Sequence, residues 1–431
     1  MFKNGLQIGL MLFGMFFGAG NLIFPPSLGF ESGSMFAPAI LGFLLSGIGM
    51  PVIALIIGTF NPGGFRAEMN QKISPIFSLL LLLALIYLSI GPLMAIPRTA
   101  ATSFSIGVLP ITGDGTLPLA LFTIVYFAFA WWLAITPTKL LARLGKVLTP
   151  MFALLIVILM LTGLFSYTTT SLAEPLGKYS ASAFGTGFIE GYNTMDALAS
   201  LAFGIILINV IHDLGVKSPT KTSFAAIKSG VFSMGLMALI YCALTFIGAQ
   251  SRTVIGISAD GGLALAAIAR HYFGIAGSVF FGIMVTVACA KTSIGLVTAI
   301  STTFAELFPK YCTQKKCAVL FSVISFIIAN EGLSKIISVS IPVLMFLYPL
   351  TIVLIILCIV GRSFSYDRRV FTWTLAITII SAAIDLVASL GVPIASSISK
   401  SMPLADAGMG WVAPAILGLV IGLAHKAASS K

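Results

Sequence analysis

Small and polar residues interrupt an apolar stretch near the amino end of the sequence. Small residues let a backbone unwind, and Pro25 and Pro26 cannot donate the amide bonds that would continue a helix normally beyond Phe24. An unwound helix offers amides that can hold a carboxylate, and carbonyls that can coordinate sodium. A small-residue packing face in a membrane helix is the alternative. The candidate binding residues are Gly18, Ala19, Gly20 and Asn21.

A second polar interruption lies far along the chain and contains an ionisable side chain. Asp196 falls where a lipid-facing side chain would be costly, so it is a functional-site candidate by default. The alternative is that this segment is an outer loop and that the helix begins only at Ala197. The candidate binding residues of this segment are Gly191, Tyr192, Asn193, Thr194, Met195 and Asp196.

A third polar group lies within an apolar stretch between residues 275 and 298. The hydroxyls of Thr292 and Ser293 can complete a sodium site facing the first interruption, or they can bond carbonyls of their own helix. Lys291 precedes them, and a lysine in hydrocarbon costs at least about 2.5 kcal/mol. We therefore expect Lys291 to face the protein interior and to pair with a carboxylate or with carbonyls. Its position several turns from either interface favours a functional role over snorkelling.

The elements that carry these groups are expected to be membrane-spanning helices. Of 431 residues, 58% are hydrophobic and only 9% charged, and the mean hydropathy is +1.09, which excludes an ordinary water-soluble domain. The first stretch lacks a clean cleavage site and is interpreted as a retained span, not a signal peptide. Twelve spans are expected, at residues 6–24, 36–58, 75–97, 118–136, 147–167, 183–209, 231–249, 275–298, 318–329, 336–360, 370–390 and 411–425.

The basic residues predict the orientation of the chain. Most of the 24 lysines and arginines fall on one side if the amino terminus is inside, so both termini are placed in the cytoplasm. This asymmetry accounts for the net charge of +11 without a nucleic-acid partner. Arg98 is placed at the outer end of a span. Cys312 and Cys317 fall on the cytoplasmic side, where thiols stay reduced, so neither a disulfide nor a zinc site is expected.

The two interruptions occupy similar places in the two halves of the chain. They lie five spans apart, and because five is odd the second element runs opposite to the first. This arrangement is typical of an inverted repeat with discontinuous helices, in which substrate and coupling ions bind near the membrane midplane. The three parts expected are residues 1–170 for the first repeat, 171–361 for the second and 362–431 for two further spans.

Four segments of the chain resemble those of a known family. They are LFGMFFGAGNLIFPPSLG, GPLMAIPRTAATSF, GYNTMDALASLAFG and ACAKTSIGL. Their order and spacing, within residues 6–310, resemble the branched-chain amino acid:cation symporters of bacteria, part of the amino acid–polyamine–organocation superfamily. The resemblance implies an all-α integral membrane fold of twelve transmembrane helices, with a 5+5 inverted-repeat (LeuT-like) core and two C-terminal helices.

The resemblance also implies a function and residue roles. Such proteins import leucine, isoleucine and valine with sodium across the bacterial inner membrane. Residues 18–21 would cradle the substrate carboxylate and amine, and residues 192–196 would contact the amine and side chain. The implied sodium site consists of Phe16, Phe17, Ala288, Thr292 and Ser293.

One departure from the family pattern concerns the coupling ion. An uncharged residue usually precedes the position of Thr292, but this chain has Lys291, whose ammonium could occupy the sodium position. Sodium-independent transport, by proton coupling or exchange, is therefore the alternative to sodium symport.

Two other classes of function fit the sequence less well. A channel would show a polar stripe through several spans, and an enzyme would need a nucleophile and base pair that the sequence lacks. No cofactor is expected beyond a coupling sodium ion. The expected partners are a small amino acid, with methionine as a further candidate, and the lipid bilayer, and the expected functional unit is a monomer.

Overall fold

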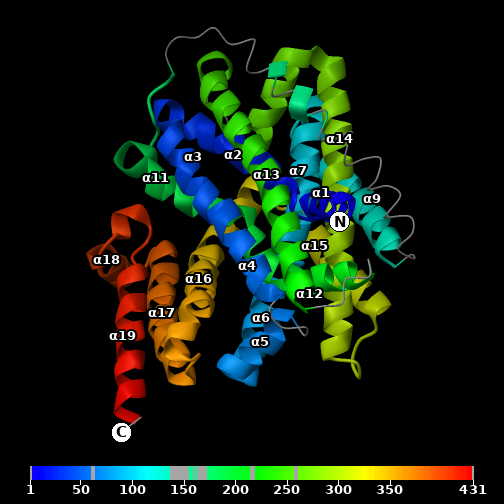
Figure 1. Ribbon diagram of the computed structural model, residues 1–431. Helices are drawn as coiled ribbons and strands as arrows, with labels where there is room; N and C mark the ends of the chain where they lie inside the picture. Colours follow the sequence, from blue (N-terminus) through cyan, green and yellow to red (C-terminus); the bar gives the residue numbers. More distant parts are fainter. Residues whose placement is uncertain are drawn as a thin grey trace.

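The computed structural model describes a helical protein (Figure 1). It describes residues 2–59, 64–135, 154, 156–158, 161–162, 172–213, 219–256 and 261–429. Within these ranges, seven helical stretches are long and apolar enough to cross a membrane. They are Ala19–Gly58, Thr116–Ala134, Thr222–Thr253, Gly261–Leu307, Leu333–Phe364, Arg368–Ser389 and Val412–Ser429. The expected span at 147–167 falls almost entirely outside the described residues.

The helices follow one another with short connections. Those of the first half are α1 (Phe2–Phe16), α2 (Ala19–Ser32), η1 (Gly33–Met35), α3 (Phe36–Leu44), η2 (Leu45–Gly49), α4 (Met50–Gly58), α5 (Gly64–Lys72), α6 (Pro75–Leu83), η3 (Ala84–Ser89), α7 (Ala95–Gly107), α8 (Leu109–Thr112) and α9 (Thr116–Ala134). Those of the second half are α11 (Lys178–Glu190), η4 (Gly191–Thr194), α12 (Asp196–Asp213), α13 (Pro219–Ile255), α14 (Gly261–Leu307), α15 (Gln314–Ala329), α16 (Leu333–Val360), η5 (Gly361–Phe364), α17 (Arg368–Ser389), α18 (Pro393–Ser401), η6 (Ala405–Ala407) and α19 (Val412–Ser429).

Both predicted interruptions are present in the structure. The first separates α1 from α2 at Phe17 and Gly18, and the second separates α11 from α12 at the short helix η4. The prediction of two broken helices is therefore confirmed. The alternative in which a helix begins only at Ala197, after an outer loop, is wrong, because α11 precedes the break and α12 starts at Asp196.

Two local predictions about prolines are wrong. Helix α2 does not end at Phe24 but continues through Pro25 and Pro26 to Ser32. Each proline removes only the amide that would bond the carbonyl four residues earlier, which a packed membrane helix tolerates. Likewise the span predicted to end at Pro97 does not end there, since Pro97 lies in the first turn of α7, where a proline costs little.

The helices around the first interruption pack as a bundle. Helix α2 packs against α13 and α14, α7 packs against α14, and α12 packs against α4. Two glycines allow the closest approaches: a Cβ on Gly107 would meet the backbone of Gly282 at 3.1 Å, and one on Gly58 would meet Gly204 Cα at 3.2 Å. Close packing of small residues is the usual means of joining membrane helices. It holds α7, α12 and α14 around the broken helix.

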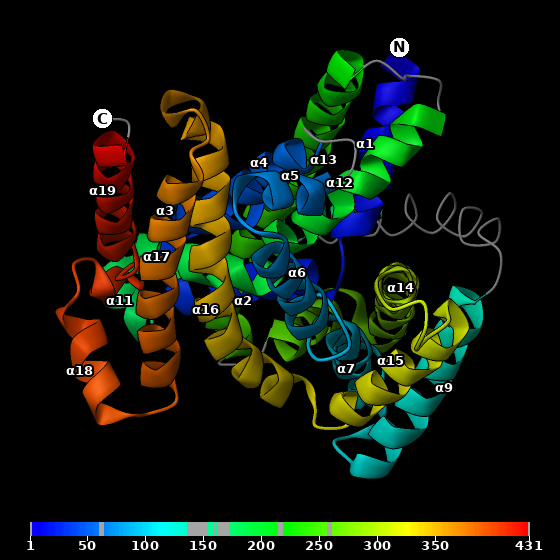
Figure 2. The same ribbon diagram turned by 90° about the horizontal axis from the view of Figure 1, so that it is seen from below.

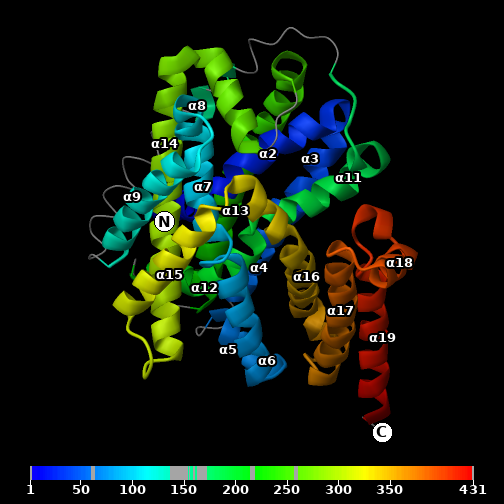
Figure 3. The same ribbon diagram turned by 180° about the vertical axis from the view of Figure 1, so that it is seen from behind.

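The C-terminal helices form a separate row. Helices α16, α17 and α19 lie side by side at the edge of the molecule, with the C-terminus at the end of α19 (Figures 1 and 3). Helices α15 and α16 meet at a tight turn in which Gly332 has φ +85°. They were predicted to form a hairpin, but they diverge from that turn (Figure 2). Helix α15 packs chiefly against α9 and α14, whereas α16 packs chiefly against α17, so the hairpin prediction is corrected.

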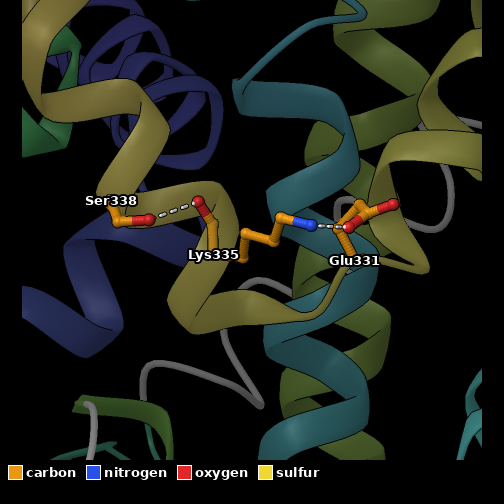
Figure 4. A network of polar contacts seen from close by, with 3 residues as sticks. All are labelled: Glu331, Lys335 and Ser338. Atoms are coloured by element: carbon orange, nitrogen blue, oxygen red, sulfur yellow. Dashed lines mark hydrogen bonds and ion pairs between the residues drawn. The ribbon is translucent and has the colours of Figure 1, made fainter. Parts of the chain in front are cut away.

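Polar contacts reinforce the first turn of α16. Lys335 pairs with Glu331, and Ser338 Oγ donates a hydrogen bond to the carbonyl of Lys335 at 2.8 Å (Figure 4). The lysine and glutamate are both exposed, so the pair contributes at most about 1 kcal/mol. This turn is therefore a surface feature and lies apart from the site described next.

The connection between α14 and α15 differs from expectation. Cys312 and Cys317 form a disulfide, with their Cα atoms 6.2 Å apart. The prediction of free thiols was based on cell compartment alone and is corrected. The chain turns between the two helices and brings the residues within the distance that a disulfide spans.

Candidate functional site

The first interruption creates a free helix start inside the protein. Gly18 is extended, with φ −128° and ψ −159°, and α2 starts at Ala19. The Gly18 amide donates to the Asn21 side-chain oxygen at 3.2 Å, which caps this helix start. The positive end of α2 is thus buried beside the break, where it favours a negative group.

The second interruption is made by a different backbone device. Residues 191–194 form the 3₁₀ helix η4, and Met195 then adopts a left-handed conformation with φ 62°. Such a conformation costs a residue with a side chain roughly 1–2 kcal/mol. The reward is positional, because the turn places Asp196 at the start of α12, directed toward the first interruption.

Three polar side chains join the two interruptions. The Asn21 amide donates to Asp196 Oδ2 at 2.6 Å and also contacts the Tyr241 hydroxyl. Tyr241 donates to the same carboxylate oxygen at 3.3 Å. All three side chains are buried, with Asp196 3% exposed. A buried carboxylate held by two donors is the arrangement expected of a site that handles charge.

A small cavity of about 50 Å³ lies at this junction. Its lining includes residues from both interruptions and from α7 and α14. The residues are Phe16, Gly18, Ala19, Gly20, Asn21, Ile90, Ala95, Arg98, Thr99, Thr194, Met195, Asp196, Ala199, Thr292 and Leu296. The structure therefore brings together residues 18–21 and 194–196, as the sequence predicted.

Three predicted residues do not reach this cavity. Tyr192 turns toward α16, where its ring stacks on Tyr348 at 4.2 Å between centroids. Asn193 donates through its amide to Glu190 at 2.8 Å. Gly191 packs against Ser46, whose hydroxyl donates to the carbonyl of Phe188 at 2.6 Å. These residues brace the second interruption and do not form the cavity wall.

Arg98 is the site residue that the sequence analysis missed. It was placed at the outer end of a span, but it is 3% exposed, lies in α7 and lines the cavity. Its Nη1 donates to the carbonyl of Asn193 at 2.8 Å, and its guanidinium lies 5.2 Å from the centroid of Phe24. The signal that could have found it was an arginine between apolar residues and small hydroxyl residues.

The expected sodium residues are divided between the cavity and the helix core. Phe16 and Thr292 line the cavity, and the Thr292 methyl would lie 3.0 Å from a Cβ on Gly18. The Thr292 hydroxyl donates to the carbonyl of Ala288 at 3.3 Å, which is the alternative considered above. Ser293 is fully buried, and its hydroxyl has no hydrogen-bond partner among the described residues.

Two other expected residues lie beside this region. Phe17 is buried within the same hydrophobic core, directly before the break. Lys291 is half-buried in α14 and is not part of the cavity lining in the described structure. The structure therefore brings Phe16, Gly18 and Thr292 together, whereas Lys291 lies on a neighbouring face of the same helix.

A larger cavity of about 240 Å³ lies beside α11. Glu31 and Glu190 both line it, together with Lys178 and Tyr179. Burial holds the pKa of the Tyr179 hydroxyl well above its ordinary value, so this side chain stays neutral. Because Asn193 bonds both Glu190 and Arg98, the second interruption connects the two cavities.

The fold and the site define the class of protein, a helical membrane transporter with interrupted helices. The structure is similar to that of Mhp1, a nucleobase-cation-symport-1 family transporter in a closed conformation with bromovinylhydantoin bound, with a TM-score of 0.59 and 16% identity over 99% of this chain and 93% of that chain. The inward-facing conformation of Mhp1 gives a TM-score of 0.60 at 14% identity, over 99% and 91% of the two chains. At these identities the likeness shows the fold alone.

The family follows from the sequence. The model of the branched-chain amino acid transport protein family matches residues 1–429, and the chain belongs to this family. It is 41% identical to the branched-chain amino acid permease BrnQ of Lactobacillus delbrueckii subsp. lactis, over 99% of this chain and 98% of the relative. It is 38% identical to the permease BraB of Bacillus subtilis, over 97% and 95%. The prediction of a multi-pass membrane transport protein, and not an enzyme, is confirmed.

Proposed function

We propose that this protein is a secondary active transporter that imports leucine, isoleucine and valine, with methionine as a further substrate, by cation symport and alternating access. The observation that carries the proposal is the meeting of the two interrupted helices at the Asn21 and Asp196 hydrogen bond of 2.6 Å. Discontinuous helices that meet in a membrane protein are the usual site of a small charged substrate and its coupling ion.

The proposed substrate site combines backbone and side-chain groups. Residues 18–21 hold the substrate at the start of α2, and residues 191–196 supply Asp196 and shape the second wall. Apolar residues, among them Ala199 and Leu296, complete the cavity and suit an aliphatic side chain. An apolar pocket distinguishes one methylene by only about 1–3 kcal/mol, so several branched-chain amino acids are accepted.

The proposed topology has twelve spans, with both termini in the cytoplasm of a bacterium. Residues 1–170 and 171–361 form the two inverted repeats, and residues 362–431 add two spans. The row of α16, α17 and α19 supports a separate C-terminal part. A monomer is the proposed functional unit, in the bacterial inner membrane.

Sodium is the proposed coupling ion. Phe16, Phe17, Ala288, Thr292 and Ser293 form its site, between the first interruption and α14. The contact between Gly18 and Thr292 and the unpartnered hydroxyl of Ser293 support this position. The alternative is proton coupling or exchange with Lys291 in place of sodium, which the half-burial of this lysine favours.

Uptake of labelled leucine and methionine into proteoliposomes tests both proposals. With sodium and proton gradients imposed separately, we expect a sodium gradient to drive leucine uptake and Ser293→Ala to raise the sodium concentration needed for half-maximal uptake. Uptake that is independent of sodium in the wild type, and becomes sodium-dependent in Lys291→Thr, supports the alternative. Absence of branched-chain uptake under every gradient contradicts the proposed function.

A further inference from the structure

We propose that Arg98 binds the α-carboxylate of the substrate while Asp196 binds its α-ammonium, so that the cavity fixes the orientation of a free amino acid and requires both of its charges. This inference rests on the proposed function and adds a residue that the site predictions lacked. It starts from the only strongly cationic side chain among those lining the 50 Å³ cavity.

Arg98 has hydrogen-bonding capacity that the described protein does not use. Its Nη1 bonds the carbonyl of Asn193, but its Nε is buried and has no hydrogen-bond partner in the part of the chain that the structure describes. A guanidinium carries five N–H donors in a planar fork that matches a carboxylate. A buried donor left unpaired is costly, so a ligand that supplies an acceptor here is strongly favoured.

The guanidinium lies where a carboxylate would gain a second interaction. A Cβ on Gly20 would be 3.0 Å from Arg98 Nη2, so the guanidinium lies against the first turn of α2. The positive end of this helix and the guanidinium therefore act on the same part of the cavity. Asp196 lies on the opposing interruption and is held by Asn21 and Tyr241.

The two charges together are complementary to a zwitterion. A positive group on α7 and a negative group on α12 face one small cavity, whose remaining wall includes Ile90, Ala199 and Leu296. An amino acid with an aliphatic side chain satisfies all three surfaces at once. A ligand without a carboxylate leaves Arg98 with its unpaired donor, and a site built to bond a group discriminates strongly against ligands that lack it.

A purely structural Arg98 makes a different prediction. In that case it only supports η4 through the carbonyl of Asn193, and its loss weakens every ligand equally. Arg252 offers a matched control, because its Nη1 also bonds backbone carbonyls, of Phe30 at 3.2 Å and Glu174 at 2.7 Å, away from the cavity.

Binding of leucine and leucinamide to the purified protein tests the inference. Leucinamide keeps the ammonium and the side chain and replaces the carboxylate with a neutral amide. We expect the wild type to prefer leucine, and Arg98→Gln to weaken leucine by about tenfold to a hundredfold while leucinamide changes by less than about threefold. Arg252→Gln is expected to preserve the wild-type preference even if it lowers the melting temperature.

Other outcomes overturn the inference. An equal loss of both ligands in Arg98→Gln, or an unchanged preference for leucine, assigns Arg98 a supporting role only. If Arg98→Gln does not fold, Arg98→Lys decides, because lysine cannot form the planar fork: leucine is then expected to weaken and leucinamide to be unchanged, and any other pattern counts against the inference. A wild type that does not bind leucine contradicts the proposed function itself.

Discussion

The two interruptions look alike in sequence but are built by different physical means. At the first, Gly18 has an extended backbone that any residue can adopt, and glycine is required by space, because Thr292 leaves no room for a Cβ. At the second, Met195 has a left-handed backbone, and the neighbouring Asp196 is required for its charge. The first interruption therefore contributes backbone groups, and the second contributes an ionisable side chain.

This difference predicts different sensitivities to substitution. A change of volume should matter most at residues 18–21, and a change of charge should matter most at Asp196. The helices around the two interruptions share one core, so a substitution at either acts on the same cavity. The comparison can be broken by showing that charge and volume matter equally at both.

The largest effect is expected from Asp196→Asn. Substitution removes the carboxylate that accepts from Asn21 and Tyr241 and leaves the substrate ammonium without a counter-charge. We expect leucine uptake in proteoliposomes to fall by about a hundredfold or more, corresponding to about 3 kcal/mol. Asp385→Asn is the matched control, since Asp385 is also buried but bonds Ser399 at 2.6 Å in the C-terminal row. Wild-type uptake in Asp196→Asn would remove charge from the account of the second interruption.

A smaller effect is expected from Gly18→Ala. The new methyl group would lie 3.0 Å from Thr292 Cγ2 and 3.2 Å from Thr292 Oγ1, so α14 must shift or the break must distort. Overpacking of this kind costs about 1–3 kcal/mol, and we expect roughly a tenfold loss of uptake. Thr292→Ser removes the methyl and keeps the hydroxyl, so the double variant should recover most of that loss.

Gly295→Ala is the control for this volume effect. Gly295 lies in α14 near Thr292, and a Cβ there meets nothing within 4 Å. Its uptake should equal that of the wild type. If Thr292→Ser does not rescue Gly18→Ala, the glycine is needed for its backbone and the contrast with Met195 is lost.

Local composition predicted the two interruptions but not the tertiary contacts around them. Glycine, asparagine and aspartate within apolar stretches were sufficient to find Asn21 and Asp196. Tyr241 was not found, because an isolated tyrosine in an apolar span does not differ from a packing residue until α13 is placed against α2. Arg98 was misplaced because Pro97 resembled a helix end, whereas a proline is accepted in the first turn of α7.

Prediction also failed where a short turn rotates polar residues away from the cavity. Tyr192 and Asn193 share the polar character of Asp196, yet η4 directs them to Tyr348 and Glu190. Residue type alone cannot separate these roles, since the separation depends on the left-handed backbone of Met195. The number of spans near residues 147–167 likewise stays a prediction.

The smallest effect is expected from Tyr241→Phe, which tests whether the two interruptions are coupled. The tyrosine hydroxyl contacts Asn21 of the first interruption and Asp196 of the second, while its ring packs against Phe43 at 5.4 Å between centroids. Phenylalanine keeps the ring and removes the hydroxyl, so we expect uptake to fall by about threefold to tenfold, for a hydrogen bond worth roughly 0.5–1.5 kcal/mol. Tyr87→Phe is the control, because that buried hydroxyl has no hydrogen-bond partner among the described residues. If the effect of Tyr241→Phe disappears in an Asp196→Asn background, the hydroxyl acts through the carboxylate; if the two losses add in full, it acts through Asn21, and the two interruptions work as separate devices.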